Sequence, residues 1–166
     1  RVEYSKLEGL FPEGHPYRWS TIGSMADLDA ASLADVQEWF KTYYGAANAV
    51  IALAGDIDAA TARPLMEKYF GDIASGPPLE RHNDWVPEHE HNSFDTMYDR
   101  VPQARLYRHW AVPGRITQQG AQLQLAARVL GGGKTSILYQ RLVEKEQLAT
   151  SVSASVETHQ LSSIFN

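Results

Sequence analysis

The chain has 166 residues, enough for one ordinary domain or for two half-domains with a junction. Apolar residues make up 43% and charged residues 21%, so a packed core is expected and disorder is not. The formal net charge is −5 with interspersed signs, and no basic patch stands out, which argues against a nucleic-acid partner. The absence of cysteine excludes disulfides, thiolate zinc sites and a cysteine nucleophile.

The first half of the chain predicts a loop region and then a helix. Prolines and glycines punctuate residues 1–31, which is typical of packed loops. A helix is predicted to begin after Ser32, because Asp35 suits a capping box and apolar residues then repeat at helical spacing. Gly45 suits a left-handed C-cap. The side chains expected on the buried face are Val36, Trp39, Phe40 and Tyr43.

A strand and a second helix are predicted next. Residues 48–54 are apolar without polar alternation, which is typical of a strand buried on both faces, and the run is far too short to cross a bilayer. The following helix is predicted at residues 61–70, starting late because Pro64 is tolerated only in a first turn. Gly71 is expected to cap it.

Residues 76–92 are predicted to be an exposed linker, because prolines and polar residues favour extended chain. Strands are predicted at 94–101 and 104–112, joined by a hairpin turn at Pro102-Gln103. Helices are predicted at 118–130 and 136–146, and strand patterns at 152–156 and from Ile164 onward. Together these elements predict an α+β fold.

A glycine loop, Gly131-Gly132-Gly133-Lys134, superficially resembles a phosphate-binding loop. That motif requires an earlier glycine where this chain has Arg128, and a preceding strand where a helix is predicted. A flexible break between two helices is therefore the favoured interpretation. The alternative is that the loop lines a substrate cavity, because glycines permit close backbone approach.

Histidines gather near the predicted linker, at His82, His89 and His91, together with Glu88 and Glu90. In a strand, His89 and His91 would face the same side and could form a two-histidine edge. The spacing differs from that of helical zinc motifs, so solvated surface histidines are the favoured interpretation. No metal ligand and no catalytic residue is assigned.

Three stretches, in order, resemble one family. The first is Gly14-His15-Pro16-Tyr17, followed by Ile22-Gly23. The second runs from Val36 through Trp39-Phe40 and Tyr43-Tyr44-Gly45 to Ala54-Gly55-Asp56 and Lys68-Tyr69-Phe70-Gly71. The third is Val129 to Ser136, continuing through Leu142-Val143 to Val152. These stretches resemble the middle of the pitrilysin/insulinase family of zinc peptidases, the inverted zincins.

The resemblance implies pieces of two similar consecutive domains, each a two-layer α/β sandwich with helices on one face of an antiparallel or mixed sheet. Residues 1–75 would end the first domain, residues 76–92 would link, and residues 93–166 would begin the second. It implies a parent zinc metalloendopeptidase that hydrolyses unfolded peptides in a closed chamber. The zinc ligands, in a His-x-x-Glu-His motif and a later glutamate, would precede this chain, so the chain alone is expected to be inactive and to bind no zinc natively.

Under this interpretation the segment is chamber wall and inter-domain scaffold, and Gly131, Gly132, Gly133 and Lys134 are candidate substrate contacts. Expected partners are an unfolded peptide and the remainder of the polypeptide or a homologous subunit; an uncovered sheet edge would also allow self-association. Periplasm and cytoplasm are both compatible, with the periplasm preferred. Two alternatives stay open: a fragment of a non-catalytic relative that binds substrate or supports a partner subunit, and an unrelated α+β module with a histidine metal site.

Overall fold

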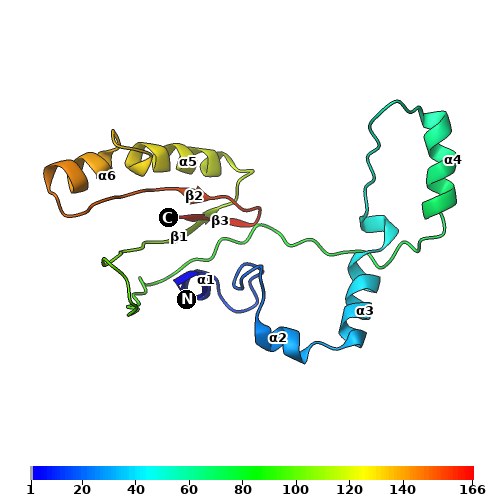
Figure 1. Cartoon of the computed structure of the whole chain (residues 1–166), viewed down its shortest axis with the longest axis horizontal. Coiled ribbons are helices and arrows are strands. Elements are labelled where there is room, and N and C mark those ends of the chain that lie inside the picture. Colours follow the sequence, from blue (N-terminus) through cyan, green and yellow to red (C-terminus); the bar gives the residue numbers. More distant parts are fainter. Residues whose placement is uncertain (1) are drawn as a thin grey trace. The chain divides into compact units, whose positions relative to one another are not determined.

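The computed structural model describes residues 2–166, which form two compact units. One unit contains residues 2–23 and 82–166, and the other is Ser24–Arg81. Helices and a small antiparallel sheet make up the structure, as Figure 1 shows, so the predicted α+β class is confirmed. No helix within residues 2–166 combines the length and apolar character that crossing a membrane requires.

The sheet belongs to the first unit and has three antiparallel strands. These are β1 (Trp110–Pro113), β2 (Val156–Glu157) and β3 (Ser162–Phe165), in the order β1-β3-β2. Ile164 of β3 lies opposite Ala111 of β1 and opposite Glu157 of β2, so these three side chains share one face. Trp110, Phe165 and Val156 share the other face by the same register.

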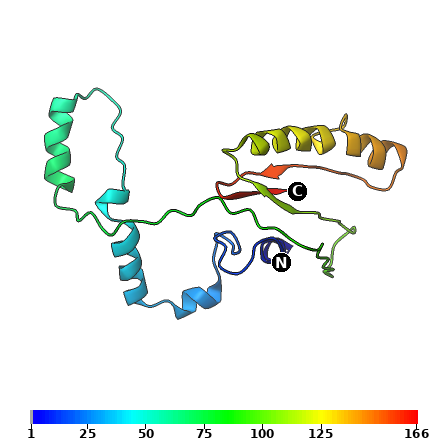
Figure 2. The same cartoon turned by 180° about the vertical axis from the view of Figure 1, so that it is seen from behind.

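A long helix runs alongside the strands in both views (Figures 1 and 2). This is α5 (Gln118–Gly131), and its N-cap is Thr117, whose hydroxyl accepts a hydrogen bond of 3.0 Å from the Gly120 amide. The short helix α6 (Ile137–Tyr139) follows and continues as the π-helix η2 (Gln140–Lys145). The helices predicted at 118–130 and 136–146 are therefore confirmed.

The apolar core of the first unit joins the two ends of the chain. Helix α1 (Val2–Leu10), in a region that the sequence had predicted to be loop, contributes Leu7 and Leu10. These pack with Phe11 and with Ile164 of β3, which are both almost completely buried. The core thus lies on the sheet face that Ile164 and Ala111 share.

The predicted hairpin between residues 94–101 and 104–112 is wrong. Residues 94–101 form no strand, and β1 pairs with β3, some fifty positions later in the chain. Both segments carry the residue types of a strand, but such a pattern does not identify the pairing partner.

In the second unit, α2 (Met25–Ala30) and α3 (Leu33–Tyr43) begin with side-chain caps. The capping box predicted for α3 is confirmed, because the Ser32 hydroxyl accepts from the Asp35 amide and the Asp35 carboxylate accepts from the Ser32 amide. The predicted left-handed C-cap is wrong: Tyr44 ends the helix, and Gly45 is extended with φ −69°. The apolar face of α3 is exposed, because no element within residues 24–81 covers it.

The predicted buried strand at 48–54 is also wrong. The 3-10 helix η1 (Ala46–Asn48) leads into unpaired chain, and Val50 is 96% exposed. Helix α4 (Ala59–Phe70) begins two residues earlier than predicted, capped by Asp58, so Pro64 lies beyond its first turn. Gly71 is the C-cap, as expected.

The boundaries at 75 and 92 are those that the family resemblance implies for two consecutive domains, whereas the two units describe contacts within this chain. The boundaries therefore stay a prediction. Residues 82–92, which the sequence assigns to the linker, belong to the first unit, and Pro87 is buried in it.

Gly45 closes the second unit by close backbone contact. The Ala46 and Ala47 amides donate to the carbonyls of Ala74 and Ser75, both at 3.0 Å, and a Cβ on Gly45 would lie 2.3 Å from the Ser75 oxygen.

We expect Gly45→Ala to break these two bonds and to speed hydrogen exchange of both amides by about tenfold or more, since overpacking costs about 1–3 kcal/mol. Gly9→Ala, where a Cβ meets nothing within 4 Å, is the control; equal protection in wild type and Gly45→Ala would contradict the prediction.

Candidate functional site

A fully buried histidine ties the turn-rich region to the predicted linker. His15 has an exposed fraction of 0%, and its ring stacks on Phe11 with centroids 4.5 Å apart. Its Nδ1 accepts from the Tyr17 amide at 3.0 Å, and its Nε2 lies 2.9 Å from the Trp85 carbonyl oxygen. Since a carbonyl only accepts, Nε2 carries the proton and donates to it, so the ring is neutral with both nitrogens bonded.

Three further contacts fix the segment around Trp85. The Trp85 amide donates to the Leu161 carbonyl at 3.2 Å, and the Leu161 amide donates to the Tyr17 hydroxyl at 3.2 Å. The His89 Nε2 donates to the Leu10 carbonyl at 2.9 Å. Residues 85–89 are therefore fastened to the N-terminal segment and to the start of β3.

The two-histidine edge that the sequence analysis weighed as an alternative is not part of a cluster of potential metal ligands within residues 2–166. There, no group of three or more His, Asp or Glu side chains is placed to hold a metal ion. The Nε2 of His89 is already engaged by Leu10, while His82 and His91 are exposed.

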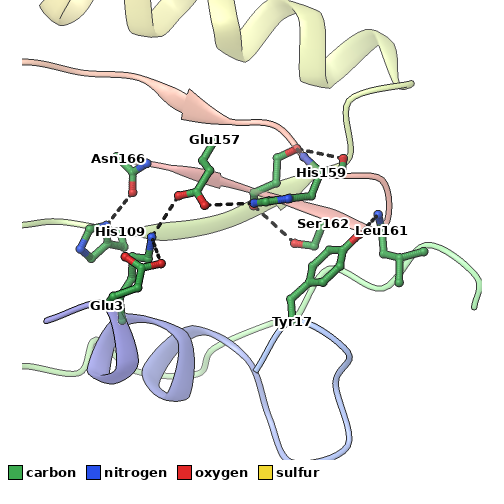
Figure 3. A network of polar contacts seen from close by, with 10 residues as sticks. Glu3, Tyr17, His109, Glu157, His159, Leu161, Ser162 and Asn166 are labelled. Atoms are coloured by element: carbon green, nitrogen blue, oxygen red, sulfur yellow. Dashed lines mark hydrogen bonds and ion pairs between the residues drawn. The ribbon is translucent and has the colours of Figure 1, made fainter. Parts of the chain in front are cut away.

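A polar network connects α1 to β2 (Figure 3). The Lys6 ammonium donates to Glu157 at 3.0 Å and to Glu3 at 2.9 Å, and the Lys6 side chain is only 7% exposed. The other Glu157 oxygen lies 3.2 Å from the His159 Nε2. The Tyr17 ring packs 5.2 Å from the His159 ring, which continues the network to the aromatic cluster around His15.

Charge and hydrogen bonding shift the pKa values of Lys6 and Glu157 in opposite directions. Burial alone would lower the pKa of Lys6, but hydrogen bonds and charges from Glu3 and Glu157 outweigh it, so the pKa is raised above 10.5. Burial alone would raise the pKa of Glu157, but Lys6 and His159 outweigh it, so the pKa is lowered below 4.5. The pair is therefore charged across the whole neutral range.

We expect Lys6→Met to destabilise the first unit by about 1–3 kcal/mol, because it leaves Glu157 without its main partner. Glu157 stabilises the folded unit above pH 4.5, and this stabilisation is lost as the pH falls through its lowered pKa. Lys6 stabilises the folded unit below pH 10.5, and this stabilisation is lost as the pH rises through its raised pKa. Urea unfolding between pH 3 and 7 should thus depend less on pH in the variant. Arg63→Met, which removes the exposed ion pair with Glu67, is the control and should cost less than about 0.5 kcal/mol. Equal costs for the two variants would contradict this prediction.

The glycine loop joins α5 to α6, as the sequence indicates. Gly131 is the buried last residue of α5, Gly132 is the C-cap, and Gly133 has a φ of 157°, which L side chains rarely adopt. The exposed Lys134 offers its carbonyl to the Gln140 amide group at 2.7 Å. The four residues named from the sequence thus run from the end of α5 into the loop before α6, and their contact with a substrate stays a prediction.

The first residue of this loop has a packing role. A Cβ on Gly131 would lie 2.3 Å from the Ala154 nitrogen and 2.7 Å from the Ser153 carbonyl carbon. We expect Gly131→Ala to destabilise the first unit by about 1–3 kcal/mol, measured by chemical denaturation. Gly9→Ala is the matched control, because Gly9 has open space around it and lies in a helix, where alanine is favoured by about 1 kcal/mol. A neutral Gly131→Ala would show that α5 does not pack as described.

Sequence patterns had not singled out His15, Lys6 or Glu157 for these roles. The available signal was the aromatic-rich turn around Gly14-His15-Pro16-Tyr17, which contributed only to the family resemblance. The Lys6–Glu157 pair spans 151 positions, so no local spacing could have indicated it.

Comparison with known proteins places these observations in a family context. A family model described as the peptidase M16 inactive domain matches residues 30–166. The chain is 27% identical over 141 residues to the protein named zinc protease PqqE of Helicobacter pylori, a match that covers 82% of this chain and 31% of that protein. The chain therefore spans about a third of the length of this curated relative.

Two solved structures share the fold. One is described as a protease from Helicobacter pylori and has a TM-score of 0.59 at 23% identity, covering 99% of this chain and 40% of that one. The other is described as a peptidase M16 inactive domain from Pseudomonas fluorescens, with a TM-score of 0.62 at 21% identity, covering 96% of this chain and 38% of that one.

Proposed function

This chain belongs to the peptidase M16 inactive-domain family, and on that premise we propose that it is part of a zinc metalloendopeptidase that hydrolyses peptides in a closed chamber. In this proposal the segment forms chamber wall and inter-domain scaffold and has no activity alone. The observation that carries the proposal is the match of residues 30–166 to a domain described as inactive. The name of the curated relative, a zinc protease, supports a peptidase parent.

The contacts of residues 82–92 support the scaffold role. His15 and Leu161 bond the backbone of Trp85, and Leu10 bonds the His89 ring. A connection that is hydrogen-bonded at several points fixes the relative position of the elements it joins, which a flexible spacer does not do. We therefore propose that residues 82–92, the second half of the connection between the two domains, are rigid.

The side chains present do not fit the zinc of such a peptidase. Residues 2–166 provide no group of three potential ligands, and the His89 Nε2 is already hydrogen-bonded to a carbonyl. The zinc ligands in this proposal lie elsewhere in the parent protein, and no catalytic step is assigned to this chain.

We retain Gly131, Gly132, Gly133 and Lys134 as proposed contacts for an unfolded peptide. The exposure of Gly132, Gly133 and Lys134 supports this role, because their backbone is accessible. The exposed apolar face of α3 supports association with the remainder of the polypeptide or with a homologous subunit. A periplasmic location stays a prediction.

Activity of the pure chain tests the proposal directly. We expect residues 1–166 to show no chelator-sensitive cleavage of an unfolded, fluorescently labelled protein, with or without added zinc. The control is the longest product of the same gene: zinc-dependent cleavage by that product supports a catalytic parent, whereas its inactivity supports a non-catalytic relative that binds substrate or supports a partner subunit. Cleavage by residues 1–166 that a chelator abolishes would overturn the assignment.

A further inference from the structure

The expectation of interspersed charges without a basic patch is wrong for one part of the chain, because the net value of −5 conceals a basic segment. Residues 100–143 contain six arginines, one lysine and no acidic residue, so this segment carries +7. The remaining residues therefore carry −12, because the whole chain carries −5. All seven basic residues are exposed, and within residues 2–166 Arg141 is the one of them that lies within 4.0 Å of a carboxylate, that of Glu146.

The basic segment begins with an extended stretch that leads into β1. Residues 103–109 form no helix and no strand, and their side chains, except that of the half-buried His109, are exposed. The Tyr107 and His109 rings stack at 6.1 Å with an angle of 14°, and Arg108 lies over the Trp110 ring at 5.6 Å. Contacts between residues two positions apart are typical of extended chain, in which alternate side chains share a face.

An aromatic neighbour holds one of the two central arginines of this stretch. Arg108 has the cation–π contact with Trp110, whereas Tyr107 raises the pKa of the exposed Arg105. The Tyr107–His109 and Arg108–Trp110 contacts continue the alternation of β1 into this stretch, and the same alternation puts Arg105 on the face of His109 and Ala111, opposite Arg108 and Trp110. The stretch therefore presents a guanidinium group on each face, and neither of the two lies within 4.0 Å of a carboxylate in residues 2–166.

The strand that follows has an unpaired edge within the described part of the chain. In the order β1-β3-β2, β1 pairs only with β3. An unpaired edge offers backbone donors and acceptors to a second extended chain, and the side chains beside it determine which sequences bind. Here those side chains are cationic and aromatic, which favours glutamate- or aspartate-containing chains.

From this arrangement we infer that residues 104–112 form a docking edge for an extended acidic peptide, which adds as a strand beside β1 with its carboxylates at Arg105 and Arg108. This inference rests on the proposed function, because it names acidic peptides as the substrate class that the segment favours. We prefer a peptide over single-stranded nucleic acid as the ligand, because the unpaired edge can form strand hydrogen bonds with a polypeptide backbone. A sugar-phosphate chain cannot form this pattern of hydrogen bonds.

The test measures binding to the full 166-residue chain and requires no proteolysis. The probe is an end-blocked, fluorescent peptide of sequence Thr-Glu-Glu-Thr-Thr-Glu-Glu-Thr, followed by fluorescence anisotropy. Matched peptides carry glutamine or lysine in place of glutamate, and a thymidine octanucleotide of the same length is the competing class. We expect the glutamate peptide to bind at least about tenfold more tightly than the lysine peptide, and its affinity to fall with salt.

The variant Arg105→Gln/Arg108→Gln should weaken binding of the glutamate peptide by about five- to tenfold, the effect of two exposed charge contacts. Arg63→Gln/Arg81→Gln removes the same charge from the other unit and should change affinity less than about twofold. Exchange protection of residues 104–112 on peptide addition gives a readout that needs no variant, should the double variant fail to fold.

Three outcomes would overturn the inference: equal affinity for the lysine peptide, unchanged affinity in a folded Arg105→Gln/Arg108→Gln variant, or tighter binding of the oligonucleotide. Failure of the proposed function would look different, because it would appear as chelator-sensitive cleavage by this chain while peptide binding stayed intact. Acidic-peptide binding by an inert chain supports both.

Discussion

The burial of Ile164 against Leu7, Leu10 and Phe11 is the contact on which the first unit depends. It joins the last strand to the first helix, so the chain must fold back almost completely before its apolar core exists. Such a core gains little from local contacts, and loop closure must come before burial. The register of β3 is fixed by the same contact, because a shift of one residue would turn Ile164 to the opposite face.

Polar contacts give this closure its specificity. An apolar cluster tolerates small rotations of α1, whereas the bond from Lys6 to Glu157 has a defined direction and length. His15 acts similarly in the turn that follows: its ring bonds one backbone group on each side, and only the neutral ring with the proton on Nε2 satisfies both. Residues 85–89 thus become part of the unit, although their composition is that of a linker.

Sequence patterns predicted the structures that depend on neighbouring residues. They failed for strands, whose formation depends on a partner far away in the sequence. The capping box of Ser32 and Asp35 and the helix ending at Gly131 were predictable, because caps and periodicity depend on neighbours within a few residues. Residues 94–101 and 48–54 have strand composition but pair with nothing here, since a strand needs a second strand that composition does not specify. The resemblance to peptidases needed only the order of short stretches, so it succeeded where pairing did not.

The second unit shows the same limit in another form. Trp39 and Phe40 of α3 have the spacing of a buried face, yet both are exposed and their rings pack instead on Tyr43 and Tyr44, one turn further along. Helical periodicity shows which face of a helix is suited to burial. It does not show whether another element of the chain covers that face. The spacing in residues 33–44 suits a buried face that the contacts of residues 24–81 do not provide, so the periodicity of α3 and its exposure are set by different parts of the fold.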